Sequence, residues 1–340
     1  MTFTAKQICL TEFPQGLPTA QTFNIASVDV PAPKDGEVRV RNLYMSVDPY
    51  MRGRMTGVRS YADPYELGKP MTGGAVGEIM DSAHQDFKAG DHVLTMRGWR
   101  EGFTADVAQL RKTEMIVKVD TNMIPAPAYL GVAGMPGLTA YAGLYDVAKF
   151  TANDTVLVSG AAGAVGSTVC QLAKAEGAYV VGIAGSDSKC DWLKSRGVDA
   201  AINYKTCGNL TKALQQAAPQ GYDVYFENVG GNTLEAALNV MNQFGRIAVC
   251  GMIANYNDKT PQPGPKNLVQ IIGKSLKIQG FIVTDHAHLQ GDYIAKLGPL
   301  MAAGKLKQME TVVDGIDQAP SAFLRLFSGD KQGKMLVKLT

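Results

Sequence analysis

The sequence predicts an α/β fold in which a doubly wound parallel sheet is joined to a second, β-rich domain. Between about residues 155 and 283, short apolar strands alternate with helical segments, which is typical of a parallel sheet covered by helices on both faces. A glycine-rich turn follows the first of these strands. The first 125 residues instead carry short strand-like runs separated by glycines and prolines, and a chain of 340 residues suits two ordinary domains.

The glycine-rich turn has the features of a phosphate-binding loop. Residues 155–167 read Thr-Val-Leu-Val-Ser-Gly-Ala-Ala-Gly-Ala-Val-Gly-Ser, so a β-branched run ends in Gly160, Gly163 and Gly166. Such a turn lets backbone N–H groups at a helix N-terminus face an anion. The strict G-x-G-x-x-G pattern is not met, because Ala161 stands two residues before Gly163. The position of the turn between a strand and a helix therefore carries the interpretation as a dinucleotide site.

Six strands and five crossovers are predicted after residue 154, the length of a complete Rossmann domain. The strands are expected at 155–160, Tyr179–Ala184, Ala200–Tyr204, Tyr222–Glu227, Arg246–Gly251 and Leu276–Val283. The first helix is expected over Val165–Glu176, because its apolar residues recur every three or four positions and Gly177 supplies a stop.

The remaining segments predict the β-rich domain. Short strands are expected at Val38–Arg41, Gly77–Ile79 and Asp91–Thr95, and the tail adds helices at Tyr293–Ala303 and Ala319–Phe327 and a strand at Met335–Leu339. Prolines and glycines around residues 125–136 mark the junction. We expect residues 1–125 and 299–340 to form the β-rich domain and residues 126–298 the dinucleotide domain.

Composition excludes several classes of protein. A net charge of +2 argues against nucleic acid and membrane surfaces as partners. No apolar run reaches the roughly 20 residues of a spanning helix, and Lys6 and Glu12 interrupt any signal-peptide core, so a cytoplasmic location is expected. The cysteines are odd in number and never in C-x-x-C spacing, which argues against a disulfide framework and a thiolate zinc site. No metal site is predicted.

The segment after the second predicted strand indicates which nucleotide binds. An NAD site carries an acidic residue there, about 20 residues beyond the glycines, whereas this chain has Ala184-Gly-Ser186. Ser188 and Lys189 follow and supply a hydroxyl and an ammonium suited to a 2′-phosphate. The sequence therefore favours NADP over NAD. The alternative is that Ser186 or Asp187 caps a helix and Lys189 is a solvated first-turn residue.

Several long motifs together give the chain a family resemblance. It resembles the zinc-free medium-chain dehydrogenase/reductase superfamily over essentially its full length, in the branch of prostaglandin reductases and alkenal/enone double-bond reductases that includes bacterial curcumin reductase. The motifs are Ser46-Val-Asp-Pro-Tyr-Met-Arg-Gly-Arg-Met55, Gly134-Met-Pro-Gly-Leu-Thr-Ala-Tyr141, Ala161-Ala-Gly-Ala-Val-Gly166, Phe226-Glu-Asn-Val-Gly-Gly231, Cys250-Gly-Met-Ile-Ala-Asn-Tyr256 and Gly280-Phe-Ile-Val283. The resemblance implies a Rossmann domain plus a β-rich, GroES-like substrate domain.

The resemblance also implies a cofactor site and its residues. The implied pyrophosphate contacts are Gly163, Ala164, Val165 and Gly166, and the implied 2′-phosphate contacts are Lys189 and Tyr204. The implied contacts on the ribose and nicotinamide side are Asn228, Cys250, Gly251, Met252 and Ile253, and the carboxamide would be fixed by Phe281, Ile282 and Val283. Lys331 stands where the family often has Asn, so no cofactor contact is assigned to it.

The absence of a zinc motif changes the expected chemistry. Zinc-dependent relatives carry Gly-His-Glu where this chain has Gly73-Gly-Ala75, so the histidine ligand is missing. Reduction of a C=C bond conjugated to a carbonyl needs a donor for the developing enolate oxygen, and a tyrosine hydroxyl suffices. The resemblance points to Tyr256 and secondarily to Tyr50, expected to face each other across a cleft, with the α-carbon proton coming from Tyr256 or water.

Blander interpretations of both tyrosines stay open. Tyr256 lies in the turn-rich Ala-Asn-Tyr-Asn and is compatible with an exposed loop residue. Tyr50 is equally compatible with a packing role beside Asp48 or Arg52. The resulting hypothesis is an NADPH-dependent reductase of α,β-unsaturated ketones and aldehydes, with a small-molecule enone or enal as substrate and a homodimeric state from the family. The alternatives are a quinone reductase and a catalytically silent NADPH-binding protein.

Overall fold

The computed structural model describes residues 2–340, which divide into two compact units. The first unit comprises Met1–Leu130, Glu310–Lys331 and Met335–Thr340, and the second comprises Gly131–Met309 and Gln332–Lys334. The chain therefore leaves its first unit twice, at residue 131 and briefly at residue 332, and ends within it.

The second unit is built on a six-stranded parallel sheet with strand order β10-β9-β8-β11-β12-β13. All five neighbouring pairs are parallel, and the order reverses direction at β8, as in a doubly wound fold. The strands are β8 Thr155–Val158, β9 Tyr179–Ala184, β10 Ala200–Asn203, β11 Tyr222–Glu227, β12 Met241–Val249 and β13 Lys277–Gly280. The expected Rossmann fold is confirmed, and two of the six strands have the predicted bounds.

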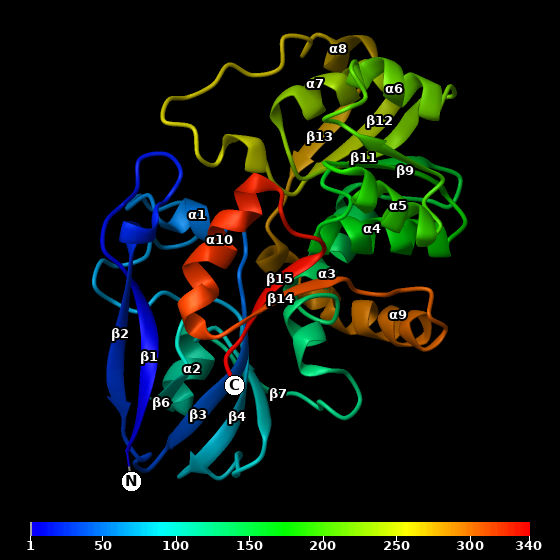
Figure 1. The fold of residues 1–340 in the computed structure, drawn as a ribbon. Coiled ribbons are helices and arrows are strands. Elements are labelled where there is room, and N and C mark those ends of the chain that lie inside the picture. The colour runs from blue at the N-terminus through cyan, green and yellow to red at the C-terminus, as the bar shows by residue number, and fades with distance from the viewer. Residues whose placement is uncertain (1) are drawn as a thin grey trace. The chain divides into compact units, whose positions relative to one another are not determined.

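Helices cover both faces of this sheet (Figure 1). The helices of this unit are α3 Met135–Tyr141, α4 Ala164–Ala175, α5 Asp187–Ser195, α6 Leu210–Ala217, α7 Gly231–Val240, α8 Gln270–Gly273 and α9 Gln290–Ala302, with a π-helix η3 Ala142–Val147 and short 3-10 helices η4 Ile253–Asn255 and η5 Val283–Leu289. Leu214 of α6 and Leu234 of α7 belong to one core cluster with Leu157 and Ile183 of the sheet. On the other face Leu193 of α5 packs against Gly182.

Two local features differ from the sequence-based expectation. Strand β12 begins at Met241, five residues before the expected start, and contains a register shift against β11. Pro136 does not break an element but lies in the first turn of α3, where a missing N–H costs no intrahelical hydrogen bond.

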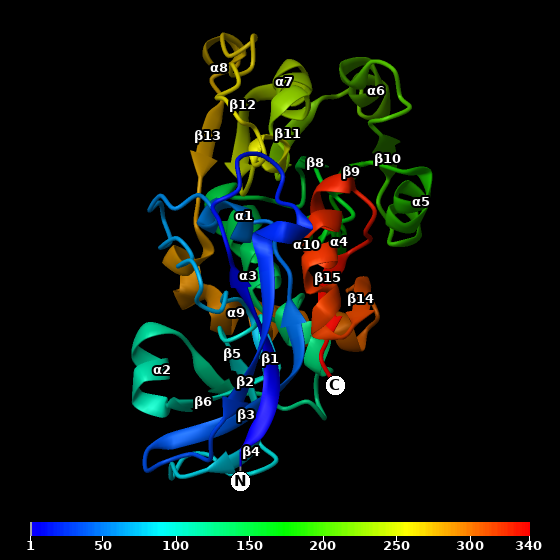
Figure 2. The ribbon, with the colours of Figure 1, turned by 60° about the vertical axis from the view of Figure 1, so that its left-hand side comes forward.

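The first unit is β-rich, as predicted (Figure 2). A seven-stranded sheet has the order β14-β15-β3-β4-β5-β7 with β6 paired to β3, and β1 and β2 form a separate antiparallel pair. The strands are β1 Phe3–Leu10, β2 Phe23–Val30, β3 Glu37–Ser46, β4 Ala75–Ser82, β5 His92–Thr95, β6 Gly102–Asp106, β7 Ile116–Lys118, β14 Glu310–Asp314 and β15 Lys334–Lys338. The helices are η1 Ala20–Thr22, α1 Met51–Arg54, α2 Val107–Thr113, η2 Ala126–Leu130, η6 Ile316–Gln318 and α10 Ala319–Ser328.

The tail completes the core of the first unit. Phe323 of α10 packs edge-on against Phe23 and Trp99, and the two latter rings stack with centroids 6.0 Å apart. Leu336 of β15 pairs with Ser46 of β3. The C-terminal helix α10 and most of strand β15 therefore lie within this unit.

No helix within residues 2–340 combines the length and the apolar character needed to cross a bilayer. No group of three or more His, Cys, Asp and Glu side chains in the same range is arranged to hold a metal ion. Cytoplasmic location stays a prediction of the sequence.

Candidate cofactor site

The glycine turn lies at the carboxyl end of β8, as the sequence predicts. Gly160 adopts φ +56°, a left-handed conformation that favours glycine, and its carbonyl accepts the N–H of Gly163 at 2.9 Å. Gly163 then caps α4, so that Ala164 and Val165 form the first turn of that helix. The free N–H groups of a helix N-terminus are thus presented at the turn.

Close backbone packing explains why the third glycine is required. A Cβ built on Gly166 would lie 2.4 Å from the carbonyl oxygen of Gly160 and 2.9 Å from the Cα of Ala161. Both neighbours are backbone atoms and have no room to yield. The helix and the turn are therefore held at a distance that any side chain at this position would increase, and the cradle fits a pyrophosphate.

A C-terminal segment lies beside this turn, which the sequence analysis did not foresee. The N–H of Gly333 donates to the carbonyl of Ala162 at 2.9 Å, and Gly333 forms a parallel bridge with Gly163. Next to it, Gln332 Nε2 donates to Ser188 Oγ at 3.2 Å. Residues 332–334 thus reach both the glycine turn and the start of α5. These contacts join residues more than 140 positions apart, so no local pattern announces them.

Lys189 and Tyr204 lie near the ends of neighbouring strands, where a 2′-phosphate site was predicted. Ser186 caps α5, and its Oγ accepts the N–H of Lys189 at 3.4 Å. The N–H of Tyr204 donates to the carbonyl of Ala184 at 3.1 Å, which places the tyrosine directly beyond the carboxyl end of β9. The structure is therefore compatible with both interpretations of this segment, as a helix cap and as a phosphate site. Ser186 caps α5, and the cap holds the backbone of Lys189 at this end of the sheet.

Lys205 is a further cation at this end that the sequence analysis missed. A Cβ on Gly185 would lie 3.0 Å from Cε1 of Tyr204 and 3.5 Å from Cε of Lys205, so both side chains extend over Gly185. A Cβ at this position would crowd the tyrosine ring, whereas it would make ordinary van der Waals contact with the lysine stem. In the sequence, the sign of this cation is that Lys205 directly follows Tyr204. The structure adds that both side chains lie over Gly185, at the same end of the sheet.

Asn228 follows β11 and is held in one orientation. Its Nδ2 donates to the carbonyl of Ser159 at 2.7 Å, and its backbone N–H donates to Ser159 Oγ at 2.9 Å. Because the Nδ2 group faces the protein, the amide presents its Oδ1 acceptor. This orientation suits a ribose hydroxyl, which has a proton to donate.

The segment 250–256 folds against the same strand end. The carbonyl of Glu227 accepts the N–H groups of Cys250 at 2.9 Å and Gly251 at 3.2 Å, and that of Asn228 accepts the N–H of Ile253 at 3.3 Å. Burial, and secondarily the nearby Glu227, raise the pKa of the Cys250 thiol to about 12. The thiol is therefore neutral, and this segment offers backbone groups and the Tyr256 hydroxyl.

Residues 281–283 connect the edge strand β13 to η5. Phe281 donates its N–H to the carbonyl of Val249 at 3.4 Å, and its ring meets Phe226 edge-on at 6.1 Å. Ile282 is extended and precedes η5. Backbone groups that leave a strand in this way are suited to bind an amide. The predicted cofactor residues of the parallel-sheet unit therefore cluster at the carboxyl ends of its strands.

Tyr50 belongs to the first unit, where it immediately precedes α1. Its ring packs against the core cluster that contains Met51 and Tyr65. Burial raises the pKa of the Tyr50 hydroxyl well above its usual range, and Tyr65 and Asp48 raise it further. The hydroxyl is therefore a neutral donor. The blander interpretation, in which Tyr50 has a packing role, is compatible with these contacts.

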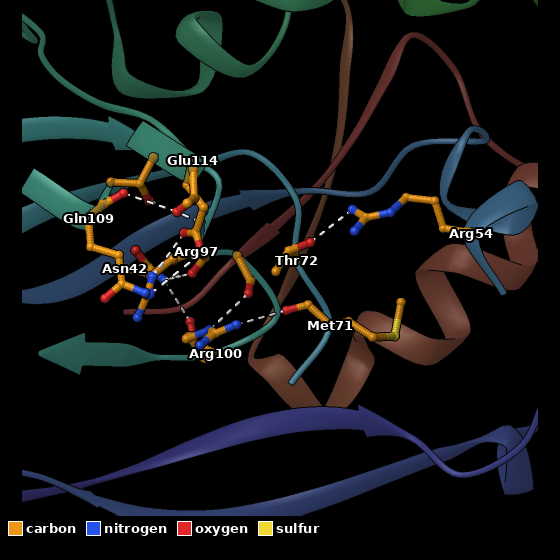
Figure 3. A network of polar contacts seen from close by, with 11 residues as sticks. Asn42, Arg54, Met71, Thr72, Arg97, Arg100, Gln109 and Glu114 are labelled. Carbon is orange, nitrogen blue, oxygen red and sulfur yellow. Dashed lines mark hydrogen bonds and ion pairs between the residues drawn. The ribbon is translucent and has the colours of Figure 1, made fainter. Parts of the chain in front are cut away.

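A polar network in the first unit fixes the segment that precedes Gly73-Gly-Ala75 (Figure 3). Asn42 Nδ2 donates to the carbonyls of Arg97 and Arg100 at 2.8 Å each, and Arg100 donates to the carbonyl of Met71 at 3.0 Å. Arg54 donates to Thr72 Oγ1 at 2.8 Å. Burial lowers the pKa of Arg100 to about 10, so the guanidinium stays charged at neutral pH. The network holds residues 71–72, directly before Gly73-Gly-Ala75, through structural rather than titrating groups.

Comparisons with known proteins cover the whole chain. A family model described as the N-terminal domain of oxidoreductase matches residues 6–113, and one described as zinc-binding dehydrogenase matches residues 164–300. The chain is 42% identical to a 2-alkenal reductase (NADP(+)-dependent) of Nicotiana tabacum over 98% of this chain and 97% of that protein. It is also 42% identical to prostaglandin reductase 1 of Bos taurus over 95% of each. The crystal structure of CurA from Vibrio vulnificus in complex with NADPH superposes with a TM-score of 0.91 at 38% identity, covering 98% of this chain and 99% of that one.

Proposed function

This chain is an NADP-dependent oxidoreductase of the medium-chain dehydrogenase/reductase superfamily, in the prostaglandin reductase and alkenal/enone reductase branch, and we propose that it reduces the C=C bond of α,β-unsaturated ketones and aldehydes. The observation that carries the proposal is the full-length similarity to the tobacco 2-alkenal reductase. The glycine cradle and the cationic strand ends supply the matching cofactor chemistry.

We assign the cofactor contacts as the resemblance implies. Residues 163–166 would hold the pyrophosphate, Lys189 and Tyr204 the 2′-phosphate, Asn228 and residues 250–253 the ribose and nicotinamide side, and the backbone of residues 281–283 the carboxamide. When bound, NADPH supplies the hydride that reaches the β-carbon of the substrate. The parallel-sheet unit is the cofactor domain in this proposal, and the β-rich unit is the substrate domain.

Tyr256 is the proposed donor to the developing enolate oxygen, and Tyr50 is the second hydroxyl. The oxygen of Tyr256 accepts the Met252 N–H at 3.4 Å, which orients the phenol and makes its own proton a better donor. Tyr50 supports the assignment because burial keeps its hydroxyl protonated. A neutral donor aimed at this oxygen stabilises negative charge without a metal. Tyr256 or water then supplies the proton that the α-carbon takes up.

A homodimer is part of the proposal, through the edge strand β13. All four residues of β13 are exposed, and it pairs on one side only, with β12. Next to this edge Ile272 and Val269 of the α8 region are exposed by 81% and 67%. An unprotected strand edge beside exposed aliphatic side chains is a site where a second copy would extend the sheet.

The function is tested by following NADPH oxidation with purified protein and a panel of enals, long-chain enones, diarylheptanoid enones and quinones. Enones and enals should be consumed with one saturated carbonyl product formed per NADPH. Faster turnover of a naphthoquinone than of small enones, with Tyr256→Phe harmless, would establish the quinone reductase alternative. Tight NADPH binding without turnover of any compound would establish the silent binding protein.

A further inference from the structure

A buried carboxylate lies directly beneath the proposed ribose contact. Glu227 is the last residue of β11, and its side chain has no exposed surface. Its Oε1 accepts hydrogen bonds from Ser159 Oγ at 2.6 Å and from the Val229 N–H at 2.6 Å, and its Oε2 accepts one from the Tyr225 hydroxyl at 2.7 Å. Three donors, from the residue after β8, from β11 and from the turn after β11, therefore converge on one group.

These donors are what makes the burial of the carboxylate tolerable. Among residues 2–340, no Lys, Arg or His forms an ion pair with Glu227. A buried charge without a counterion needs hydrogen bonds to both oxygens to remain stable. A fully satisfied network of this kind also fixes the orientation of each partner.

The orientation of the Ser159 hydroxyl connects Glu227 to Asn228. A carboxylate only accepts hydrogen bonds, so Ser159 must direct its proton to Glu227 and its lone pairs elsewhere. The backbone N–H of Asn228 donates to this oxygen at 2.9 Å, and the carbonyl of Ser159 accepts the Asn228 Nδ2 group at 2.7 Å. Asn228 is thus tied to Ser159 at two points, and its Oδ1 is presented as an acceptor.

The backbone carbonyl of Glu227 also anchors the start of residues 250–256. Its carbonyl accepts the N–H groups of Cys250 and Gly251 at 2.9 Å and 3.2 Å. One residue therefore links the end of β8, the turn that carries Asn228, and the start of residues 250–256.

We propose that Glu227 is a positioning residue for the cofactor: by orienting the Ser159 hydroxyl it fixes Asn228, whose Oδ1 accepts a ribose hydroxyl. The inference rests on the proposed assignment of Asn228 as a cofactor contact. Glu227 itself touches no cofactor atom in this scheme. Its effect is on the affinity for NADPH and NADP⁺ and not on the chemistry of the substrate.

Two hydroxyl groups on the same carboxylate provide a matched test. Ser159→Ala and Tyr225→Phe each remove one donor from Glu227, but only the Ser159 hydroxyl also accepts the Asn228 N–H. We expect Ser159→Ala to raise the Kd for NADP⁺, measured by calorimetric titration, about fivefold, the effect of one ordinary hydrogen bond. Tyr225→Phe should lower thermal stability while leaving that Kd close to the wild-type value.

Glu227→Gln provides the direct test of the carboxylate. Glutamine keeps the length and volume, but its amide nitrogen cannot accept the hydrogen bond that one of the three donors makes. We expect a higher Kd for NADP⁺ with the KM for the enone unchanged. Should this variant fail to fold, the Ser159→Ala and Tyr225→Phe pair decides the question alone. An equal rise in the Kd for NADP⁺ in Ser159→Ala and Tyr225→Phe would show a general loss of order around Glu227 and would overturn the inference. An unchanged Kd in Ser159→Ala would also overturn it.

Asn228→Ala separates this inference from the proposed cofactor assignment. A normal Kd for NADP⁺ in Asn228→Ala removes the assignment and the inference with it. A raised Kd in Asn228→Ala with a normal Kd in Ser159→Ala removes the inference alone. If the cofactor assignment and the inference are both correct, the double variant Ser159→Ala/Asn228→Ala should bind NADP⁺ no more weakly than Asn228→Ala, because Ser159 acts through Asn228.

Discussion

The phenolic oxygen of Tyr256 lies 3.4 Å from the backbone nitrogen of Met252 and accepts its hydrogen bond. This contact folds the ring back over its own segment, and a Cβ on Gly251 would lie 3.0 Å from the same oxygen. The tyrosine is therefore not a loosely attached loop residue. Its hydroxyl is oriented by the segment that also carries the proposed nicotinamide contacts.

Tyr256→Phe tests whether this orientation serves catalysis. We expect kcat for an enone to fall about 100-fold, the cost of losing one donor to a developing oxyanion, with little change in the Kd for NADP⁺. Tyr179→Phe is the control, because its hydroxyl donates to the Ala217 carbonyl at 2.9 Å from the opposite, amino-terminal end of β9. Equal rates for wild type and Tyr256→Phe would remove the tyrosine from the mechanism.

Gly166→Ala tests the cradle. The added methyl would lie 2.4 Å from the Gly160 carbonyl oxygen, so the turn must shift, and we expect NADPH binding to be lost together with thermal stability. Gly291→Ala in the first turn of α9 is the control, because no described atom outside its own helix backbone and its chain neighbours lies within 4 Å of the added methyl. That change should leave the affinity for NADPH and the thermal stability nearly unchanged. Normal NADPH affinity in Gly166→Ala would contradict the packing argument.

Two lysines are expected to distinguish NADPH from NADH. Lys189→Ala and Lys205→Ala should each raise the KM for NADPH about 10-fold and leave the KM for NADH nearly unchanged, because only NADPH carries the 2′-phosphate. Lys194→Ala, an exposed lysine in the last turn of α5, is the control and should change neither value. A variant that raises the KM values for NADPH and NADH equally would show that its lysine does not bind the 2′-phosphate.

Cys250 should resist alkylation even though it lies in the cofactor segment of a proposed enal reductase. Burial raises the pKa of its thiol to about 12. An acid with a raised pKa stays protonated below that value, so at pH 8 the thiolate fraction is about one in ten thousand. Cys207 and Cys250 are both partly exposed residues, so they form a matched pair. Mass spectrometry after iodoacetamide treatment should show modification of Cys207 before Cys250. Modification of both at the same rate would contradict the raised pKa of the Cys250 thiol.

The oligomeric state tests the edge strand β13. Ile272→Asp should convert a dimer into a monomer in size-exclusion chromatography with light scattering, because it places a charge on an aliphatic side chain that is 81% exposed. Met123→Asp in the β-rich unit is the matched control, since Met123 is 80% exposed. A monomeric wild-type protein, or dissociation by both substitutions, would contradict the proposed interface.

Most of the parallel-sheet unit could be predicted because its signals are local. The strands Tyr179–Ala184 and Tyr222–Glu227 have the predicted bounds, since each is a short apolar run between turn residues. The start of β12 was missed, because Met241 pairs with Tyr222 across a register shift, and that pairing depends on β11 and not on the sequence of the segment.

The residues of the proposed cofactor site also divide into those that local sequence features predict and those that depend on tertiary contacts. Gly160, Gly163 and Gly166 were found because backbone conformation and close approach restrict these positions to glycine within a few residues of chain. Lys205 and Gln332 were missed, because their positions beside Gly185 and Ser188 depend on the pairing of β9 with β10 and on the return of the C-terminal segment.

The sequence by itself determined the alternation of strands and helices, the glycine cradle, the absence of the carboxylate that an NAD site carries, and the family. These are properties of hydrophobic period, backbone conformation and motif, which a chain expresses locally. Only the tertiary structure decided that Ser159 and Glu227, 68 positions apart, share a hydrogen bond beneath Asn228, and that Gly333 lies beside Gly163. Such contacts form when the sheet and the chain ends assemble, because burial then forces each polar group to find a partner wherever the fold supplies one.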